Sequence, residues 1–231
     1  MIRLTPRRRG WRGWLYATHL WVGIVVAVQL LLWTASGLLM TANPIETVRG
    51  EHLRRTLAPV DLRGVGAVVS PAEAMTGRTD ALELTTVLGR PVWRVTEGKA
   101  KWLVDARTGK HWTLTAADAV AVVRAATVLS GEPVVTRVPD PPPLELRRPG
   151  GAWRIDWPNG THVYVGTAGD ILALRTNTWR WHDLAWGLHI LDPVEREDTH
   201  HPVLIASAVL SLISVISGIV LIVVYFRRRR A

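Results

Sequence analysis

The chain of 231 residues contains no cysteine. It can therefore form no disulfide, and it supplies no thiolate ligand to an iron–sulfur cluster or a haem. Three common catalytic signatures are also missing, namely a glycine-rich phosphate loop after a strand, G-x-S-x-G and H-E-x-x-H. These absences argue against a P-loop nucleotide hydrolase, an α/β-hydrolase and a zinc protease of the usual kinds.

Charge is missing from two long runs. Residues 13–45 and 201–226 contain no aspartate, glutamate, lysine or arginine. A helix needs about 20 apolar residues to cross a bilayer, so we predict transmembrane helices over 13–42 and 201–226. The first run is longer than the core of a cleaved signal peptide, and no clear A-x-A site follows it. We therefore expect an uncleaved signal anchor.

The net charge of +9 lies entirely in the two tails, 1–12 and 227–231. Nine arginines there account for it, because the remaining 19 lysines and arginines equal the 19 acidic residues. A nucleic-acid-binding domain would carry a basic excess of its own, so we expect no nucleic acid partner. The positive-inside rule instead places both termini in the cytoplasm of a bacterial inner (cytoplasmic) membrane, with residues 43–200 outside it.

The outer region contains an internal repeat. A W-R-aliphatic strand begins at Trp93 and again at Trp153, and in each copy a second apolar strand and a glycine turn follow. Asn159-Gly160 is a strong hairpin signal, so each copy is expected to be an antiparallel β-meander. Helix-capping patterns begin at Ser70 and at Thr115, the latter opening a helix to about Leu129.

These patterns divide the outer region into four segments. We predict a first meander-and-helix region over 43–138, a stiff proline-rich linker over 139–150, a second meander over 151–178, and a helix with its following turn over 179–200. The fold class is thus a membrane α+β protein with two transmembrane helices flanking two β-meander/helix repeats. In the last helix, Trp179, His182, Trp186 and His189 follow steps of three and four residues and form one stripe.

Several motifs, in their order along the chain, resemble the PepSY-associated transmembrane family, whose members are also described as iron-regulated membrane proteins. The segments that carry the likeness are His19-Leu20-Trp21-Val22-Gly23, Ser36-Gly37-Leu38-Leu39-Met40 with Pro44-Ile45-Glu46, the strand pair from Trp153 to Leu174, Trp186-Gly187-Leu188-His189-Ile190-Leu191-Asp192, and His201-Pro202. The resemblance implies PepSY-like outer domains and haem b, with electrons passed across the membrane to acceptors such as ferric siderophores. This chain departs from the larger relatives in having two spans instead of four. The resemblance therefore implies that the electron donor is a quinol or a separate cytoplasmic flavoprotein.

Histidines beside the apolar helices are the candidate haem ligands. His19 lies inside the first charge-free run, where an ionisable residue by default marks function. His189 and His201 lie near the outer end of the spans, and His182 and Trp186 are weaker candidates for the same cofactor site. His19 is about 31 Å of helix from Met40 at the outer end, so it cannot share a haem with His201. We expect an outer haem between His189 and His201, and an inner haem between two copies of His19 in a homodimer.

Two other interpretations stay open. PepSY-like domains resemble propeptide modules that bind a partner, so the chain is alternatively a non-catalytic, membrane-anchored binding or assembly module, or a subunit of a larger membrane complex. Small residues in the second span, Ser211, Ser214, Ser217 and Gly218, are expected to serve ordinary helix packing. The turn at His200 and His201, with Glu197 and Asp198, is expected to be a solvated polar turn and not a surface metal site.

Overall fold

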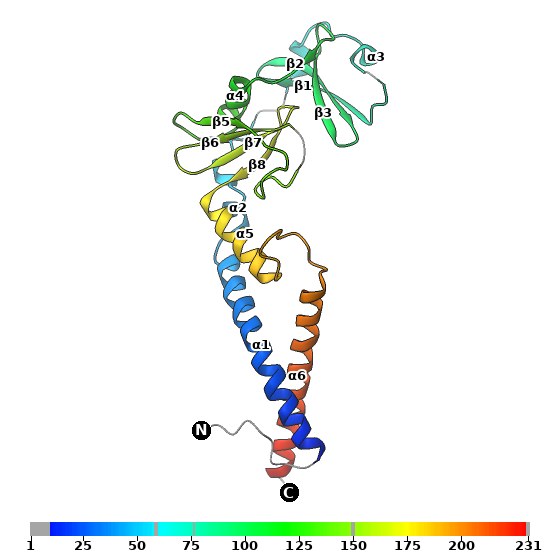
Figure 1. The fold of residues 1–231 in the computed structure, drawn as a ribbon. Coiled ribbons are helices and arrows are strands. Elements are labelled where there is room, and N and C mark those ends of the chain that lie inside the picture. The colour runs from blue at the N-terminus through cyan, green and yellow to red at the C-terminus, as the bar shows by residue number, and fades with distance from the viewer. Residues whose placement is uncertain (1–9, 58–59, 76, 149–150, 230–231) are drawn as a thin grey trace. The chain divides into compact units, whose positions relative to one another are not determined.

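The computed structural model describes residues 10–57, 60–75, 77–148 and 151–229, and these form two compact units (Figure 1). A helical unit takes the described residues before Ile45 and after Arg180. A β-rich unit takes the described residues of the range Ile45–Arg180.

Two long helices dominate the helical unit: α1 (Trp11–Thr41) and α6 (Pro202–Arg229). Both are long and apolar enough to cross a membrane, with mean hydropathy of 2.1 and 2.7 over their most apolar windows. Only 17% and 6% of those windows are buried, so most of the apolar surface of both helices is exposed. The predicted helices over 13–42 and 201–226 are therefore confirmed as helices.

A shorter helix, α5 (Asn177–His189), precedes α6. The helix predicted from 179 is confirmed, although it starts two residues earlier. The turn after α5 folds back onto it, because the Asp183 carboxylate accepts a hydrogen bond at 2.9 Å from Arg196 and the Trp186 indole donates to the Arg196 carbonyl at 3.2 Å. Gly187 makes this possible, since a Cβ there would lie 2.7 Å from the Arg196 side chain.

The β-rich unit contains two four-stranded antiparallel sheets, each with its strands in sequence order (Figure 1). The first consists of β1 (Ala81–Val87), β2 (Arg90–Glu97), β3 (Ala100–Asp105) and β4 (His111–Trp112). The second consists of β5 (Val134–Arg137), β6 (Trp153–Asp156), β7 (His162–Val165) and β8 (Ile171–Arg175). The repeat predicted from the sequence is confirmed as a pair of meanders, in which the W-R strands are β2 and β6. The first strand of each sheet, β1 or β5, was not expected.

The helical elements of this unit are short apart from one. They are α2 (Ile45–Val48), the 3-10 turns η1 (Glu51–Leu53) and η2 (Leu62–Gly64), α3 (Pro71–Ala74) and α4 (Ala116–Ala126). The helix expected at Ser70 is a single turn, in which the Ser70 hydroxyl accepts from the Glu73 amide. The helix expected at Thr115 is α4, and its capping box is complete: Thr115 and Asp118 each bond the other's amide.

The segment predicted to be a stiff linker, 139–150, is not a spacer between the two sheets. Strand β5 was assigned to the first region, 43–138, but it pairs with β6 in the second sheet. Residues 139–150 therefore connect two strands of one sheet. Their described part packs onto that sheet, because Leu146 is buried with Tyr164 and Ala173. A sequence rich in proline indicates stiffness, but it does not show which surface the segment covers.

One hydrophobic core joins the two sheets of the β-rich unit. It contains Val92 and Leu103 from the first sheet, Ile155 and Val163 from the second, and Val123 from α4, all of them fully buried. The Trp153 indole adds a hydrogen bond of 3.1 Å to the Leu114 carbonyl, which precedes α4. Because residues of both sheets and of α4 share this core, we expect the two sheets to fold as one body.

Candidate functional site

His19 is held by a serine of the other long helix. Its Nδ1 atom lies 2.9 Å from the Ser217 hydroxyl and 3.1 Å from the Ser214 carbonyl. A carbonyl oxygen only accepts, so Nδ1 carries the proton and donates it. In the neutral ring the Nε2 atom then has a free electron pair, and it has no hydrogen-bond partner among the described residues.

His189, the last residue of α5, makes an equivalent hydrogen bond to a serine of α1. Its Nδ1 atom lies 3.1 Å from the Ser36 hydroxyl. That hydroxyl uses its own hydrogen toward the Leu32 carbonyl, at 2.6 Å, so the serine accepts the Nδ1 proton of the histidine. The ring also stacks on Trp33, with centroids 5.9 Å apart and planes at 29°. Again Nε2 is the nitrogen without a partner in the described part of the chain.

A serine–glycine pair lies under each imidazole. The glycine after Ser36 is Gly37, where an added Cβ would lie 3.7 Å from the His189 Cε1 atom. The glycine after Ser217 is Gly218, where an added Cβ would lie only 3.1 Å from His19 Cε1. Small residues allow a ring to lie against a helix backbone, so each pair supplies both the space and the hydrogen-bond acceptor.

This geometry is typical of histidine ligands of metals. A ligating histidine usually donates its second ring N–H to a nearby acceptor, which fixes both the tautomer and the ring orientation. Both serines that accept these protons are buried, each 6% exposed. Ser36 follows His19 on α1 by about 17 residues, or about 25 Å of helix. The two imidazoles therefore mark two separate sites at different depths along α1.

His201 is different. Its Nε2 atom donates to the Ile190 carbonyl at 2.8 Å, and its Nδ1 atom accepts from the Leu204 amide at 3.4 Å. Both ring nitrogens are occupied, and the second bond caps the start of α6. Among the described residues, His189 therefore has a ring nitrogen without a hydrogen-bond partner, whereas His201 does not. The outer haem site expected between His189 and His201 is thus not preformed.

The two weaker candidates also have distinct surroundings. His182 is half-buried, and within the described ranges no hydrogen bond to its ring is observed. Trp186 is 36% exposed and uses its indole N–H for the loop after α5. Trp186 therefore fixes the loop after α5.

The serine acceptors were missed at the sequence level. Ser217 was expected to serve packing only, and Ser36 was noted only within a motif. The available signal was a Ser-Gly dipeptide in each apolar helix, which is short and common. The partner of each serine lies 198 or 153 positions away in the chain, so spacing alone does not reveal the pairing.

The β-rich unit contains a separate polar cluster around Glu145. The carboxylate accepts from the Arg180 Nε at 2.6 Å and from the Tyr164 hydroxyl at 2.9 Å, and it lies 2.7 Å from His162 Nδ1. Burial acts to raise the pKa of Glu145, but these three partners outweigh it and the pKa lies below its ordinary value. Burial and the neighbouring carboxylate raise the pKa of Tyr164. Every oxygen of Glu145 is satisfied, so this cluster is suited to holding the described residues 139–148 on the sheet and not to acid–base chemistry.

No group of three or more histidine, aspartate or glutamate residues with metal-binding geometry occurs in the ranges that the structure describes. An axial haem site would need only one or two such donors, so this absence does not bear on the haem expected at His19 and His189. No protein-family model, curated protein or solved structure matches the chain.

Proposed function

We propose that this protein is a b-type cytochrome of the bacterial inner membrane that passes electrons outward. The exposed apolar surfaces of α1 and α6 support membrane insertion, because a core helix of a soluble protein would be mostly buried. The arginines that flank both helices support cytoplasmic termini and an extracytoplasmic β-rich unit of two PepSY-like repeats.

The observation that carries the proposal is the pair of serine-bound histidines. An imidazole is costly inside a bilayer, where His19 would lie. In both His19 and His189 the Nδ1 atom is hydrogen-bonded, and Nε2 has no hydrogen-bond partner among the described residues. His19 and His189 would each hold haem iron through Nε2. Ser217 and Ser36 would keep the Nδ1 proton and the ring plane in place. Bound haem supplies reversible one-electron chemistry, with a potential set by its axial ligands and its surroundings.

Each site in one chain offers one preformed nitrogen. A second copy of His19 would complete the inner site, and the resulting homodimer would have four long helices. A cytoplasmic flavoprotein or quinol would donate the electron, and ferric iron or a ferric siderophore outside the cell is the proposed acceptor.

The test is an absorption spectrum of the detergent-purified full chain from haem-replete cells, oxidised and then reduced with dithionite. We expect sharp reduced α and Soret bands, with part of the signal lost in His19→Ala and another part in His189→Ala. His111→Ala is the matched control, because His111 is an exposed histidine of the β-rich unit, and it should keep the wild-type spectrum.

A second function is favoured by the same contacts. The bonds from His19 to α6 and from His189 to α1 would also serve to hold helices together in an anchor for a PepSY-like binding or assembly module, or in a subunit of a larger complex. A folded, colourless protein that takes up no added haem would exclude the cytochrome and leave this module as the function.

A further inference from the structure

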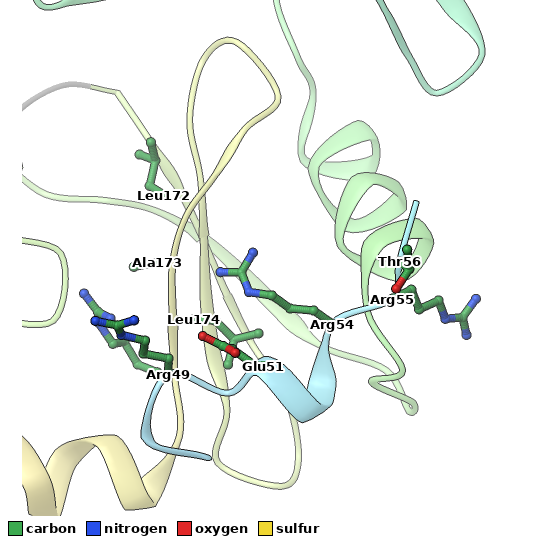
Figure 2. Close-up of a pocket in the computed structure, with 9 residues that line it drawn as sticks. Arg49, Glu51, Arg54, Arg55, Thr56, Leu172, Ala173 and Leu174 are labelled. Carbon is green, nitrogen blue, oxygen red and sulfur yellow. The ribbon is translucent and has the colours of Figure 1, made fainter. Parts of the chain in front are cut away.

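A pocket of about 490 Å³ in the β-rich unit is lined by arginines (Figure 2). It lies between strand β8 and the segment Arg49–Arg55, here called the arginine turn. Four arginines line it, and Glu51 is the one acidic residue among the lining side chains: Arg49, Arg54, Arg55 and Arg175 against Glu51. Because the Arg55 side chain points away from the pocket (Figure 2), the other three arginines and Glu51 give it a net charge of about +2.

The backbone of the arginine turn is fixed on both sides. Gly50 adopts a φ of 69° and packs so closely on Leu174 that a Cβ there would collide with the leucine side chain. Further along, the Arg55 amide donates to the Ala126 carbonyl at 2.8 Å, and the Leu53 carbonyl accepts from the Val128 amide at 3.0 Å. The turn is thus held by β8 at one end and by the end of α4 at the other, so the arginines start from a defined backbone.

Two of these arginines have guanidinium groups that are available to bind a ligand. Arg49 and Arg54 are exposed, and no hydrogen bond or ion pair of either guanidinium group occurs within the described ranges. Figure 2 shows the Arg54 side chain extending toward Ala173 and Leu174 of β8, whereas Arg55 points to the other side. Arg175 on β8 is held in place by its hydrogen bond to the Glu145 carbonyl at 2.7 Å and by the Trp179 ring 4.2 Å away.

The basic side chains are all arginines, and this identifies the ligand chemistry. A guanidinium group is planar and always charged, and its fork of N–H donors matches the oxygens of a phosphate. Leu172 and Leu174 give the pocket an apolar wall, and its volume lies in the range of sites for organic ligands and exceeds what one phosphate fills. We propose that this pocket binds the phosphate group of an organic phosphate.

Two sources of that group are possible by chemistry, a phospholipid headgroup and a soluble phosphate compound. The chain favours the lipid, because Arg49 follows the end of α1 by only eight residues and Arg175 precedes α5 by two. Basic residues next to a membrane span attract anionic headgroups. The site is independent of the proposed haem chemistry.

The experiment uses the full chain and the double variant Arg49→Gln/Arg54→Gln. Native mass spectrometry from micelles with equal amounts of phosphatidylglycerol and phosphatidylcholine should show phosphatidylglycerol adducts on the wild type. In the double variant the affinity for this lipid should fall about tenfold. The matched control Arg78→Gln/Arg107→Gln removes the same charge from exposed positions outside the pocket and should behave as wild type.

A second measurement separates the sources. Inorganic phosphate is titrated against protein in phosphatidylcholine nanodiscs and followed by ³¹P line broadening. Pocket-dependent broadening without a change in lipid adducts would assign the site to a soluble phosphate compound. If the Arg49→Gln/Arg54→Gln variant equals wild type in both measurements, or if the control variant loses as much as it does, the proposal is overturned.

Discussion

The Nδ1 atom of His19 lies 2.9 Å from the hydroxyl of Ser217, a residue 198 positions later in the chain. His189 and Ser36 repeat this relationship with the roles of the helices exchanged, since here α1 provides the serine. Each serine binds the Nδ1 atom of its histidine, so that only Nε2 is left to bind a metal. If the sites hold haem, the serines should control affinity without touching the iron.

Ser217→Ala and Ser36→Ala should therefore weaken haem binding at different sites. Loss of such an outer hydrogen bond typically costs 10–100-fold in metal affinity. Ser217→Ala should fall near the lower end, because the Ser214 carbonyl still accepts from His19. The measurement is haem titration of apoprotein, followed by the Soret band. Ser211→Ala is the control, since Ser211 only meets Gln29 at 3.5 Å, and equal losses in all three variants would contradict the assignment.

Gly218→Ala should disturb the His19 site more than Gly37→Ala disturbs the His189 site. A Cβ at residue 218 would lie 3.1 Å from the His19 ring and must displace it, whereas a Cβ at residue 37 would lie at an ordinary 3.7 Å from His189. The reduced spectrum should lose its His19-dependent part in Gly218→Ala and remain nearly unchanged in Gly37→Ala. The reverse order would show that the rings do not lie as described.

Single cysteines test the proposed topology cleanly, because the chain has no cysteine of its own. Lys99→Cys, in the exposed turn between β2 and β3, should react in intact spheroplasts with a maleimide that cannot cross membranes. Arg12→Cys and Arg228→Cys should react only after the membrane is permeabilised. Labelling of Arg12→Cys in intact spheroplasts would place the N-terminus outside and contradict the charge-based orientation.

Glu145→Gln should destabilise the β-rich unit by about 2 kcal/mol at neutral pH, because hydrogen bonds to a charged group contribute roughly that much. The pKa of Glu145 is lowered in the folded protein. The stability from its ionised form is therefore present above the ordinary glutamate pKa of about 4.3 and is lost as the pH falls through the folded-state value. Thermal unfolding of wild type should thus approach that of Glu145→Gln as the pH falls below about 4. A constant difference down to pH 2 would contradict this role.

Ile155→Ala should destabilise both sheets, because the fully buried Ile155 belongs to their shared core. Truncation of a buried isoleucine costs about 2–5 kcal/mol. Hydrogen exchange of the full chain should accelerate in β2 and β3 as well as in β6 and β7. Acceleration in the second sheet alone would show that the two sheets unfold separately.

Local patterns were sufficient to predict most of the fold. The apolar runs predicted α1 and α6, the W-R repeats predicted the meanders, and the Thr115 capping box predicted the start of α4. Strand β5 was missed because its four residues include no turn signal or alternation that separates it from the preceding loop. Its membership of the second sheet depends on pairing with β6 across the proline-rich segment.

The candidate site was predicted only in part. His19 was identified because an ionisable residue in an apolar helix is costly. His189 was identified because it lies on the Trp/His stripe near the outer end of the spans. His201 was also a candidate, because it begins the second apolar run at its outer end. In the structure, however, its ring nitrogens bond the Ile190 carbonyl and the Leu204 amide. Whether a ring nitrogen is available for a ligand or already hydrogen-bonded depends on contacts that form only when the chain folds.

The long separation between His19 and Ser217 also governs how the protein is made. Ribosomes add about 5–20 residues per second, so His19 is synthesised about 10–40 s before its acceptor on α6. If α1 spans a membrane as proposed, it must persist there during that interval with an imidazole that lacks its α6 partner, and Ser36 is likewise made before His189. A nascent chain stalled before residue 217 would lack the Ser217 acceptor, and its His19 would be available to a chaperone, an insertase or another helix.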